Sequence, residues 1–119
     1  MHDWGSGLGL HYQEPFGTEK SRIQVHQWPN EIPIGGQPAE TTRIVSNYNR
    51  FLEQTDIPWL FLYASPGATA PAATADYWAE RAHNVETVYI GNGLHYVQED
   101  QPYTIGRAIA DWYRRLEAN

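Results

Sequence analysis

The sequence predicts an α/β protein in which parallel strands are packed against helices. Short apolar runs alternate with longer segments whose apolar residues recur at helical spacing, and this alternation is typical of parallel sheets. The run WLFLY, within residues 58–64, is apolar at consecutive positions, as expected for a strand buried on both faces. With 119 residues, 41% of them hydrophobic, the chain is long enough for one domain with a core.

Three helices and two strands are predicted after residue 37. The helices are expected at residues 38–54, 71–82 and 102–116, and the strands at residues 58–64 and 84–90. Pro38 suits a first helical turn, and Arg114 and Arg115 suit a last one. The apolar stripe of the first helix comprises Ile44, Val45, Tyr48, Phe51 and Leu52, and that of the third comprises Ile105, Ile109, Trp112 and Leu116.

The first third of the chain carries weaker signals. Residues 5–11 are compatible with the start of a helix, although their glycines weaken it. Residues 13–38 contain prolines at positions 15, 29, 33 and 38 and glycines at 17, 35 and 36, so no long regular element is expected there. Such a long irregular segment is uncommon in a compact domain, and two strands make a very small sheet.

Charge and composition exclude several classes of function. The net charge is −6 with eight Lys and Arg and no basic run, which is a poor match for nucleic acid or an anionic membrane. The absence of cysteine excludes disulfides, thiolate catalysis and cysteine zinc sites. The histidines form no His-x-x-x-His pair, so no metal site is predicted. No membrane-spanning run or signal peptide is visible, and the expected location is the cytoplasm.

The first candidate for chemistry is Asp3, in the stretch MHDWGSG. A nucleophile elbow is a tight turn that raises a nucleophile above a sheet, and it needs small residues such as Gly5 beside it. A carboxylate in that position can form an ester that water later cleaves. The alternative is that Asp3 caps the helix that follows, because Asp is a favoured N-cap residue.

The second candidate is His95, which follows the second predicted strand in the stretch GLHY. In open α/β sheets, sites form at the carboxyl ends of the strands, and a histidine there can act as a general base near neutral pH. The alternative is an ordinary loop histidine without a chemical role.

Several stretches together resemble the haloalkane dehalogenases of the α/β-hydrolase superfamily. They are HDWGSGLGLHY, YQEPFGTEKSR, QWPNEIPIGGQPAE, IPWLFLYASPGA and VYIGNGLHYVQEDQPYTIGRAIADWYRRL, and they cover nearly the whole chain. The resemblance implies a partial α/β-hydrolase fold as a single domain over residues 1–119. Residues 1–12 would form the elbow and its helix, residues 13–37 a remnant of the lid, and residues 38–119 the C-terminal part of the main domain.

The resemblance also implies a role for each site residue. Asp3 would attack the carbon that bears the halogen, and the indole N–H of Trp4 would bind the leaving halide. The backbone N–H of Trp4 would contribute to the oxyanion hole, and His95 would activate the water that hydrolyses the ester on Asp3. Leu94 would border the substrate pocket. The partners implied are a small halogenated alkane, water and the halide ion, with no cofactor.

The sequence departs from the family pattern in three respects. Counterparts of the first strands and of most of the helical lid are absent, which implies a family member truncated at the N-terminus. Ser65, Pro66 and Gly67 follow the strand after which other members place an aspartate, and no acid stands there, so no third triad member is assigned. We therefore expect the chain to be completed by a second copy or by a complementing chain. Two alternatives remain: a non-catalytic fragment or interaction module, and a luciferase-like monooxygenase that oxidises coelenterazine.

Overall fold

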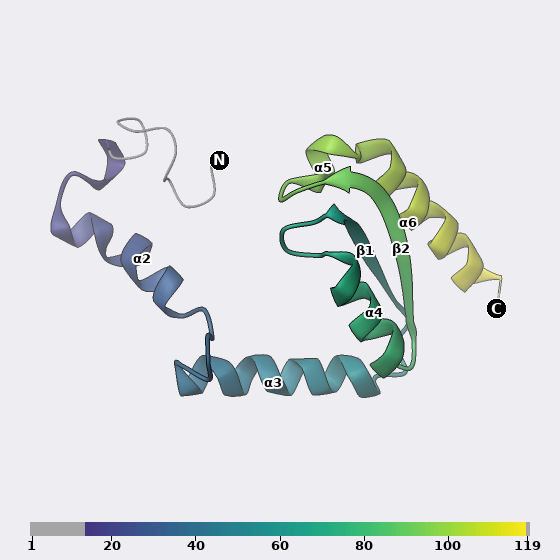
Figure 1. The fold of residues 1–119 in the computed structure, drawn as a ribbon, viewed down its shortest axis with the longest axis horizontal. Helices are drawn as coiled ribbons and strands as arrows, with labels where there is room; N and C mark the ends of the chain where they lie inside the picture. Colours follow the sequence, from purple (N-terminus) through teal and green to yellow (C-terminus); the bar gives the residue numbers. More distant parts are fainter. Residues whose placement is uncertain (1–13, 119) are drawn as a thin grey trace. The chain divides into compact units, whose positions relative to one another are not determined.

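The computed structural model describes residues 14–118, which fall into two units divided between Tyr48 and Asn49. Helix α3 crosses this division. Figure 1 shows the elements in chain order, and their bounds are η1 (Glu14–Phe16), α2 (Glu19–Asn30), α3 (Ala39–Gln54), β1 (Trp59–Pro66), α4 (Ala72–Arg81), β2 (Val85–Gly93), α5 (Val97–Asp100) and α6 (Pro102–Glu117).

The second unit is built on a parallel two-stranded sheet. β1 pairs with β2 in a register that runs from Trp59 opposite Val85 to Tyr63 opposite Tyr89. The register shifts between Tyr63 and Ser65, so the strands end in an irregular, bulged segment. Helix α4 connects the two strands, as parallel pairing requires. The predicted α/β class and the predicted positions of α3, β1, α4, β2 and α6 are therefore confirmed.

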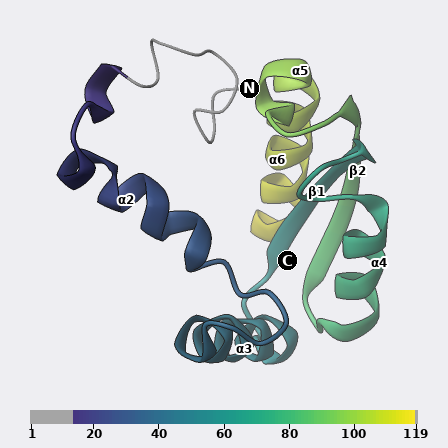
Figure 2. The same ribbon diagram turned by 60° about the vertical axis from the view of Figure 1, so that its left-hand side comes forward.

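The two faces of the sheet are covered by different helices. Trp59 of β1 packs edge-on against Trp78 of α4, with ring centroids 5.3 Å apart. Neighbouring residues of a strand point to opposite faces, and Glu86 of β2 lies one position beyond the partner of Trp59. Glu86 forms an ion pair with Arg115 of α6. Helices α4 and α6 thus lie on opposite faces of the sheet, as Figures 1 and 2 show.

The core is small and lies in the second unit. The buried residues of the described chain are Ala64, Ala75, Trp78, Ile90 and Thr55. Large apolar side chains remain exposed elsewhere, and Trp28 of α2 exposes 77% of its surface. None of the helix residues described in the first unit is buried. No helix in the described part of the chain is long and apolar enough to cross a membrane.

β1 was expected to be buried on both faces, but it is only partly buried. Residues Trp59–Tyr63 are half-buried, and only Ala64 of this strand is fully buried. β2 covers one edge of β1, but no other strand in residues 14–118 covers the opposite edge. An apolar strand becomes fully buried only where neighbours flank both edges and helices cover both faces. The half-burial of β1 therefore reflects the narrow sheet.

The irregular structure predicted for residues 13–38 is also wrong, because α2 is a regular helix of 12 residues. A capping box starts it: the Ser21 N–H donates to the Thr18 hydroxyl at 3.2 Å, and the Thr18 N–H donates to the Ser21 hydroxyl at 3.1 Å. No glycine or proline follows until Pro29, which stands in the last turn. The short helix α5 was not predicted either. The helix expected to begin in residues 5–11 lies outside the described residues.

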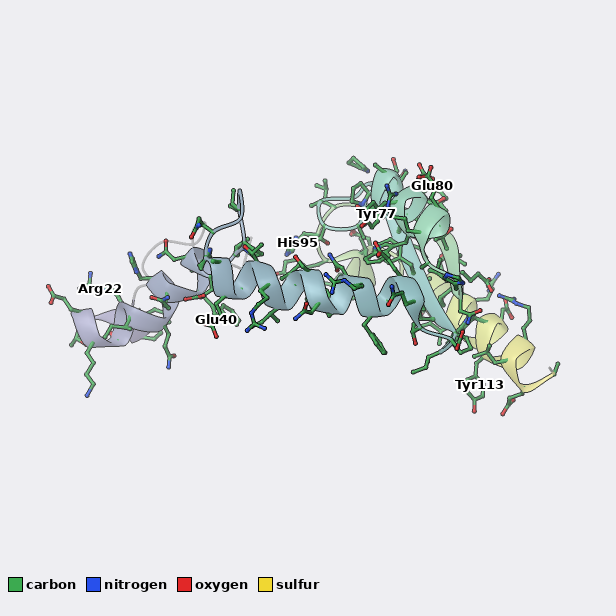
Figure 3. All side chains as sticks on the ribbon, turned by 90° about the horizontal axis from the view of Figure 1, so that it is seen from below. Arg22, Glu40, Tyr77, Glu80, His95 and Tyr113 are labelled. Carbon is green, nitrogen blue, oxygen red and sulfur yellow. The ribbon has the colours of Figure 1, made fainter. Side chains whose placement is uncertain are left out.

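A tyrosine links the end of α3 to α4 within the second unit. The Tyr77 hydroxyl donates to Glu53 Oε1 at 3.0 Å, and the Arg81 guanidinium lies 4.4 Å from the centre of the Tyr77 ring. Figure 3 labels Tyr77 on α4. The hydrogen bond to Glu53 raises the pKa of the Tyr77 phenol above its usual value, and desolvation and the negative charge of Glu53 add to this effect. The positive charge of Arg81 lowers the pKa and opposes it.

We predict that removal of the Tyr77 hydroxyl changes the alkaline stability of the protein. The folded chain holds the phenol proton more tightly than the unfolded chain, so this contribution is fully present below about pH 10 and is lost as the pH rises through the folded-state pKa. The melting temperature of the wild type should therefore fall more steeply above about pH 10 than that of Tyr77→Phe.

Circular dichroism melts over a pH series measure the difference. The matched control is Tyr103→Phe, since Tyr103 exposes 87% of its surface on α6. Its alkaline slope should equal that of the wild type. Equal slopes for wild type and Tyr77→Phe would contradict the role given to the Glu53 hydrogen bond.

Candidate active site

The described part of the candidate site lies at the carboxyl ends of β1 and β2. Leu94 and His95 stand in the turn between β2 and α5. Asp3 and Trp4, the other two predicted site residues, lie outside the described residues. The structure therefore places the predicted general base and pocket residue, and the nucleophile and halide donor remain predictions.

Two backbone hydrogen bonds join the segments that follow the strands. The N–H of Gly67 donates to the carbonyl of Gly93 at 3.0 Å, and the N–H of Ala68 donates to the carbonyl of Leu94 at 2.8 Å. The bulge lies between Tyr63 and Ser65, and these bonds continue the parallel pairing past it. They hold the backbone of the residue immediately before His95, so this histidine leaves the sheet from an anchored position.

Gly67 is required by the geometry of this junction. Its φ of +62° lies in the left-handed region, which glycine adopts without the steric cost that other residues pay. A Cβ at this position would lie 2.6 Å from the Ala64 carbonyl oxygen and 2.8 Å from the Ala70 carbonyl oxygen. Both are backbone atoms that cannot rotate away. Gly67 therefore allows the loop after β1 to pass close to itself between Ala64 and Ala70, in the conformation in which the Gly67 N–H reaches the Gly93 carbonyl.

A contact with the residue before α6 also holds the end of β2. The side-chain amide of Gln101 donates to the carbonyl of Asn92 at 2.9 Å. Gly91, with φ of +110°, passes so near that a Cβ there would lie 3.1 Å from the same amide group. Sequence reasoning missed Gln101, because nothing in the local pattern shows that a residue at the start of α6 touches the end of β2.

An open depression lies at these strand ends. Its lining residues are Ser65, Pro66, Asn92, Gly93, Leu94, Asp100 and Gln101. Asp100 is the one ionisable side chain in this lining, and Leu94 contributes an apolar side chain that is 61% exposed. Ser65 adds a hydroxyl to this lining. Asp100 was not predicted; the fold brings it beside the end of β2, where a Cβ at Gly93 would lie 3.4 Å from its carboxylate.

His95 combines an exposed side chain with a fixed backbone. Its ring stacks edge-on against Tyr96, with centroids 4.8 Å apart, and Figure 3 labels it near the strand ends. An imidazole placed there is accessible to substrate and water, and histidine is the side chain that most often serves as a general base. Within residues 14–118, no three His, Asp or Glu side chains lie close enough together to hold a metal ion.

The sequence is similar to that of several haloalkane dehalogenases, although no family model matches it. A haloalkane dehalogenase of Mesorhizobium japonicum is 40% identical over 101 residues, which cover 85% of this chain and 33% of the relative. One from Sphingobium indicum is 38% identical over 106 residues, which cover 88% of this chain and 35% of the relative. The chain therefore spans about a third of the length of the curated relatives it matches.

Solved structures show the same similarity. The haloalkane dehalogenase DbeA from Bradyrhizobium elkani superposes with a TM-score of 0.76 at 36% identity, covering 90% of this chain and 37% of that one. DatA from Agrobacterium tumefaciens superposes with a TM-score of 0.70 at 35% identity, covering 87% of this chain and 36% of that one. The described helices and parallel strands thus form part of an α/β-hydrolase fold, as the resemblance predicted.

We predict that Gly67→Ala destabilises the chain by about 2–5 kcal/mol, because a left-handed alanine costs roughly 1–2 kcal/mol and forced overpacking roughly 1–3 kcal/mol more. Gly106 offers a matched control, since it lies inside α6 with no atom within 4 Å of an added Cβ. Gly106→Ala should stabilise by about 0.5–1 kcal/mol through helix propensity.

Urea unfolding followed by tryptophan fluorescence measures both changes. Hydrogen exchange of the Ala68 amide should also accelerate in Gly67→Ala and stay unchanged in Gly106→Ala. If the two substitutions shift the urea midpoint equally, the contact between the two loops does not constrain the fold in the way described.

Proposed function

Since the chain is homologous to the haloalkane dehalogenases over about a third of their length, we propose that it carries the reacting residues of a dehalogenase active site. The substrate is a small halogenated alkane, and the reaction is hydrolysis of its carbon–halogen bond. The observation that carries the proposal is the 40% identity over 101 residues, within which His95 occupies an anchored turn at the strand ends. The assignment of residues 1–12, 13–37 and 38–119 to elbow, lid remnant and main domain belongs to the same proposal.

The first chemical step is a displacement at carbon. A carboxylate oxygen of Asp3 attacks the carbon that bears the halogen, so a C–O bond forms while the carbon–halogen bond breaks. The halide departs with the bonding electron pair, and the indole N–H of Trp4 stabilises its charge. This division of labour needs a nucleophilic carboxylate next to a hydrogen-bond donor, and Asp3 and Trp4 are adjacent in the chain.

The second step hydrolyses the alkyl ester formed on Asp3. The imidazole of His95 takes a proton from water, and the resulting hydroxide attacks the ester carbonyl. The backbone N–H of Trp4 stabilises the oxyanion until the alcohol leaves and the carboxylate is restored. The imidazolium then releases its proton to solvent. Haloalkane and water are thereby converted to alcohol, halide and a proton.

The described residues support this chemistry in two respects. His95 follows a backbone anchored by the bond from Ala68 to Leu94, and a general base contributes most when its position is set before the reaction. Leu94 adds an apolar surface to the depression beside it, which suits an uncharged alkane better than a polar wall does. The carboxylate that orients the histidine stays unassigned.

A non-catalytic interaction module is the alternative that a specific observation favours. β1 is only half-buried, and the helices described in the first unit have no buried residue. A chain with so much uncovered apolar surface suits association with a partner, either a second copy or a complementing chain. In that case the dehalogenase similarity records ancestry, and binding is the function.

We predict that release of bromide from 1,2-dibromoethane depends on two residues in different ways. Asp3→Asn should abolish release altogether, because no ester forms without the carboxylate. His95→Gln should release about one bromide per chain in a burst, because the ester forms but is hydrolysed very slowly. The steady-state rate after the burst should fall roughly 10³- to 10⁴-fold. His83→Gln is the matched control, since His83 is exposed in the turn between α4 and β2, at the amino ends of the strands and away from their carboxyl ends. It should retain activity within twofold.

Ion chromatography of bromide, in burst and steady-state phases, distinguishes these outcomes. Equal turnover by wild type and Asp3→Asn would refute the assigned nucleophile. A folded wild type that releases no bromide would favour the interaction module, and sedimentation velocity over a concentration series would then show whether the chain associates with itself.

A further inference from the structure

Gln101 occupies a helix-capping position but does not cap the helix. It is the N-cap residue of α6, with φ of −128° and ψ of 42°, and its side chain accepts no capping hydrogen bond from a backbone N–H of the first turn. N-cap positions favour Ser, Thr, Asp and Asn, whose short side chains reach those N–H groups. A glutamine at this position is therefore not explained by the requirements of α6.

The Gln101 side chain is instead directed at β2. Its Nε2 donates to the Asn92 carbonyl at 2.9 Å, and its Oε1 lies 3.5 Å from the Thr104 hydroxyl, which donates to it. The Asn92 carbonyl accepts a hydrogen bond, and the Thr104 hydroxyl donates one. The two partners therefore distinguish the NH₂ group of the Gln101 amide from its oxygen. Gly91 leaves the space that the amide group occupies, since a Cβ there would approach it to 3.1 Å.

This contact completes an unbroken set of bonds along the backbone that leads to His95. Three successive carbonyls, those of residues 92, 93 and 94, each accept a hydrogen bond: the first from Gln101 and the other two from the segment after β1. Gln101 follows these carbonyls in the sequence, and the other two donors, Gly67 and Ala68, precede them. The segment that carries His95 is therefore tied both to the loop after β1 and to the beginning of α6.

We propose that Gln101 is a positioning residue for His95. By binding the Asn92 carbonyl, it keeps the end of β2 in the conformation from which the chain continues to His95. The consequence for catalysis rests on the proposed function, whereas the consequence for the conformation of His95 does not. Gln101 itself touches neither substrate nor reacting atoms.

Three variants isolate the donor from the bulk of the side chain. Gln101→Met keeps the length of the side chain but removes the donor, and Gln101→Lys keeps a donor at similar reach. Gln98→Met is the matched control, because Gln98 is exposed on α5, three residues away, and undergoes the same chemical change.

The first measurement is the ¹³C-edited NMR signal of the His95 ring in the full chain, which requires no activity. Gln101→Met should shift and broaden this signal, whereas Gln101→Lys and Gln98→Met should leave it as in the wild type. The second measurement is bromide release from 1,2-dibromoethane. In Gln101→Met, kcat should fall about ten- to a hundredfold with KM within twofold, since a misplaced base slows the reaction without weakening binding. Gln101→Lys should restore kcat to within about threefold.

The outcomes separate this inference from the proposed function. A wild type without bromide release, combined with a changed His95 signal in Gln101→Met alone, supports the positioning role and contradicts the dehalogenase proposal. An unchanged His95 signal in folded Gln101→Met overturns the positioning role, whatever the activity. If Gln101→Met does not fold, Gln101→Lys decides: a wild-type His95 signal supports the role of the donor, and a changed signal in the folded variant overturns it.

Discussion

The site depends on the hydrogen bonds that join the two loops after the parallel strands. Gly67 and Ala68 donate to the carbonyls of Gly93 and Leu94, and Gly67 does so from a left-handed conformation in which a Cβ would clash with the Ala64 and Ala70 carbonyls of its own loop. Parallel pairing brings the carboxyl ends of β1 and β2 to one edge, and these bonds extend the pairing beyond the bulge. This contact holds the backbone that leads to His95. A change that destabilises the two loops is therefore expected to displace this histidine as well.

The narrow sheet sets the second constraint. β1 has an apolar sequence suited to a strand surrounded on all sides, yet its first five residues are half-buried, and the described chain pairs it with β2 alone. The indole N–H of Trp59 is buried without a hydrogen-bond partner among the described residues, although its ring packs against Trp78. A buried donor without a partner costs about 1–3 kcal/mol. The packing of β1 and any catalytic activity are therefore linked, because β1 carries one of the two loops that hold the site.

Homology and structure contribute different parts of the functional argument. Identity of 34–40% to haloalkane dehalogenases indicates which chemistry to expect, but it extends over only about a third of those proteins. The structure adds what similarity does not contain: which atoms hold the turn before His95, and that Asp100 and Ser65 share a depression with Leu94. The similarity thus supports the chemistry proposed for Asp3, and the structure describes the backbone that carries His95.

The sequence by itself determined the α/β class, the two strands and the helices α3, α4 and α6, because apolar periodicity and strand-ending glycines and prolines are local signals. It also pointed to His95 through its place after a strand. It failed at α2, where the reciprocal bonds of Thr18 and Ser21 outweighed the surrounding prolines and glycines. Only the tertiary structure decided the role of Gln101 and the partial burial of β1. Both depend on contacts between segments distant in sequence, and no local pattern encodes which segments meet.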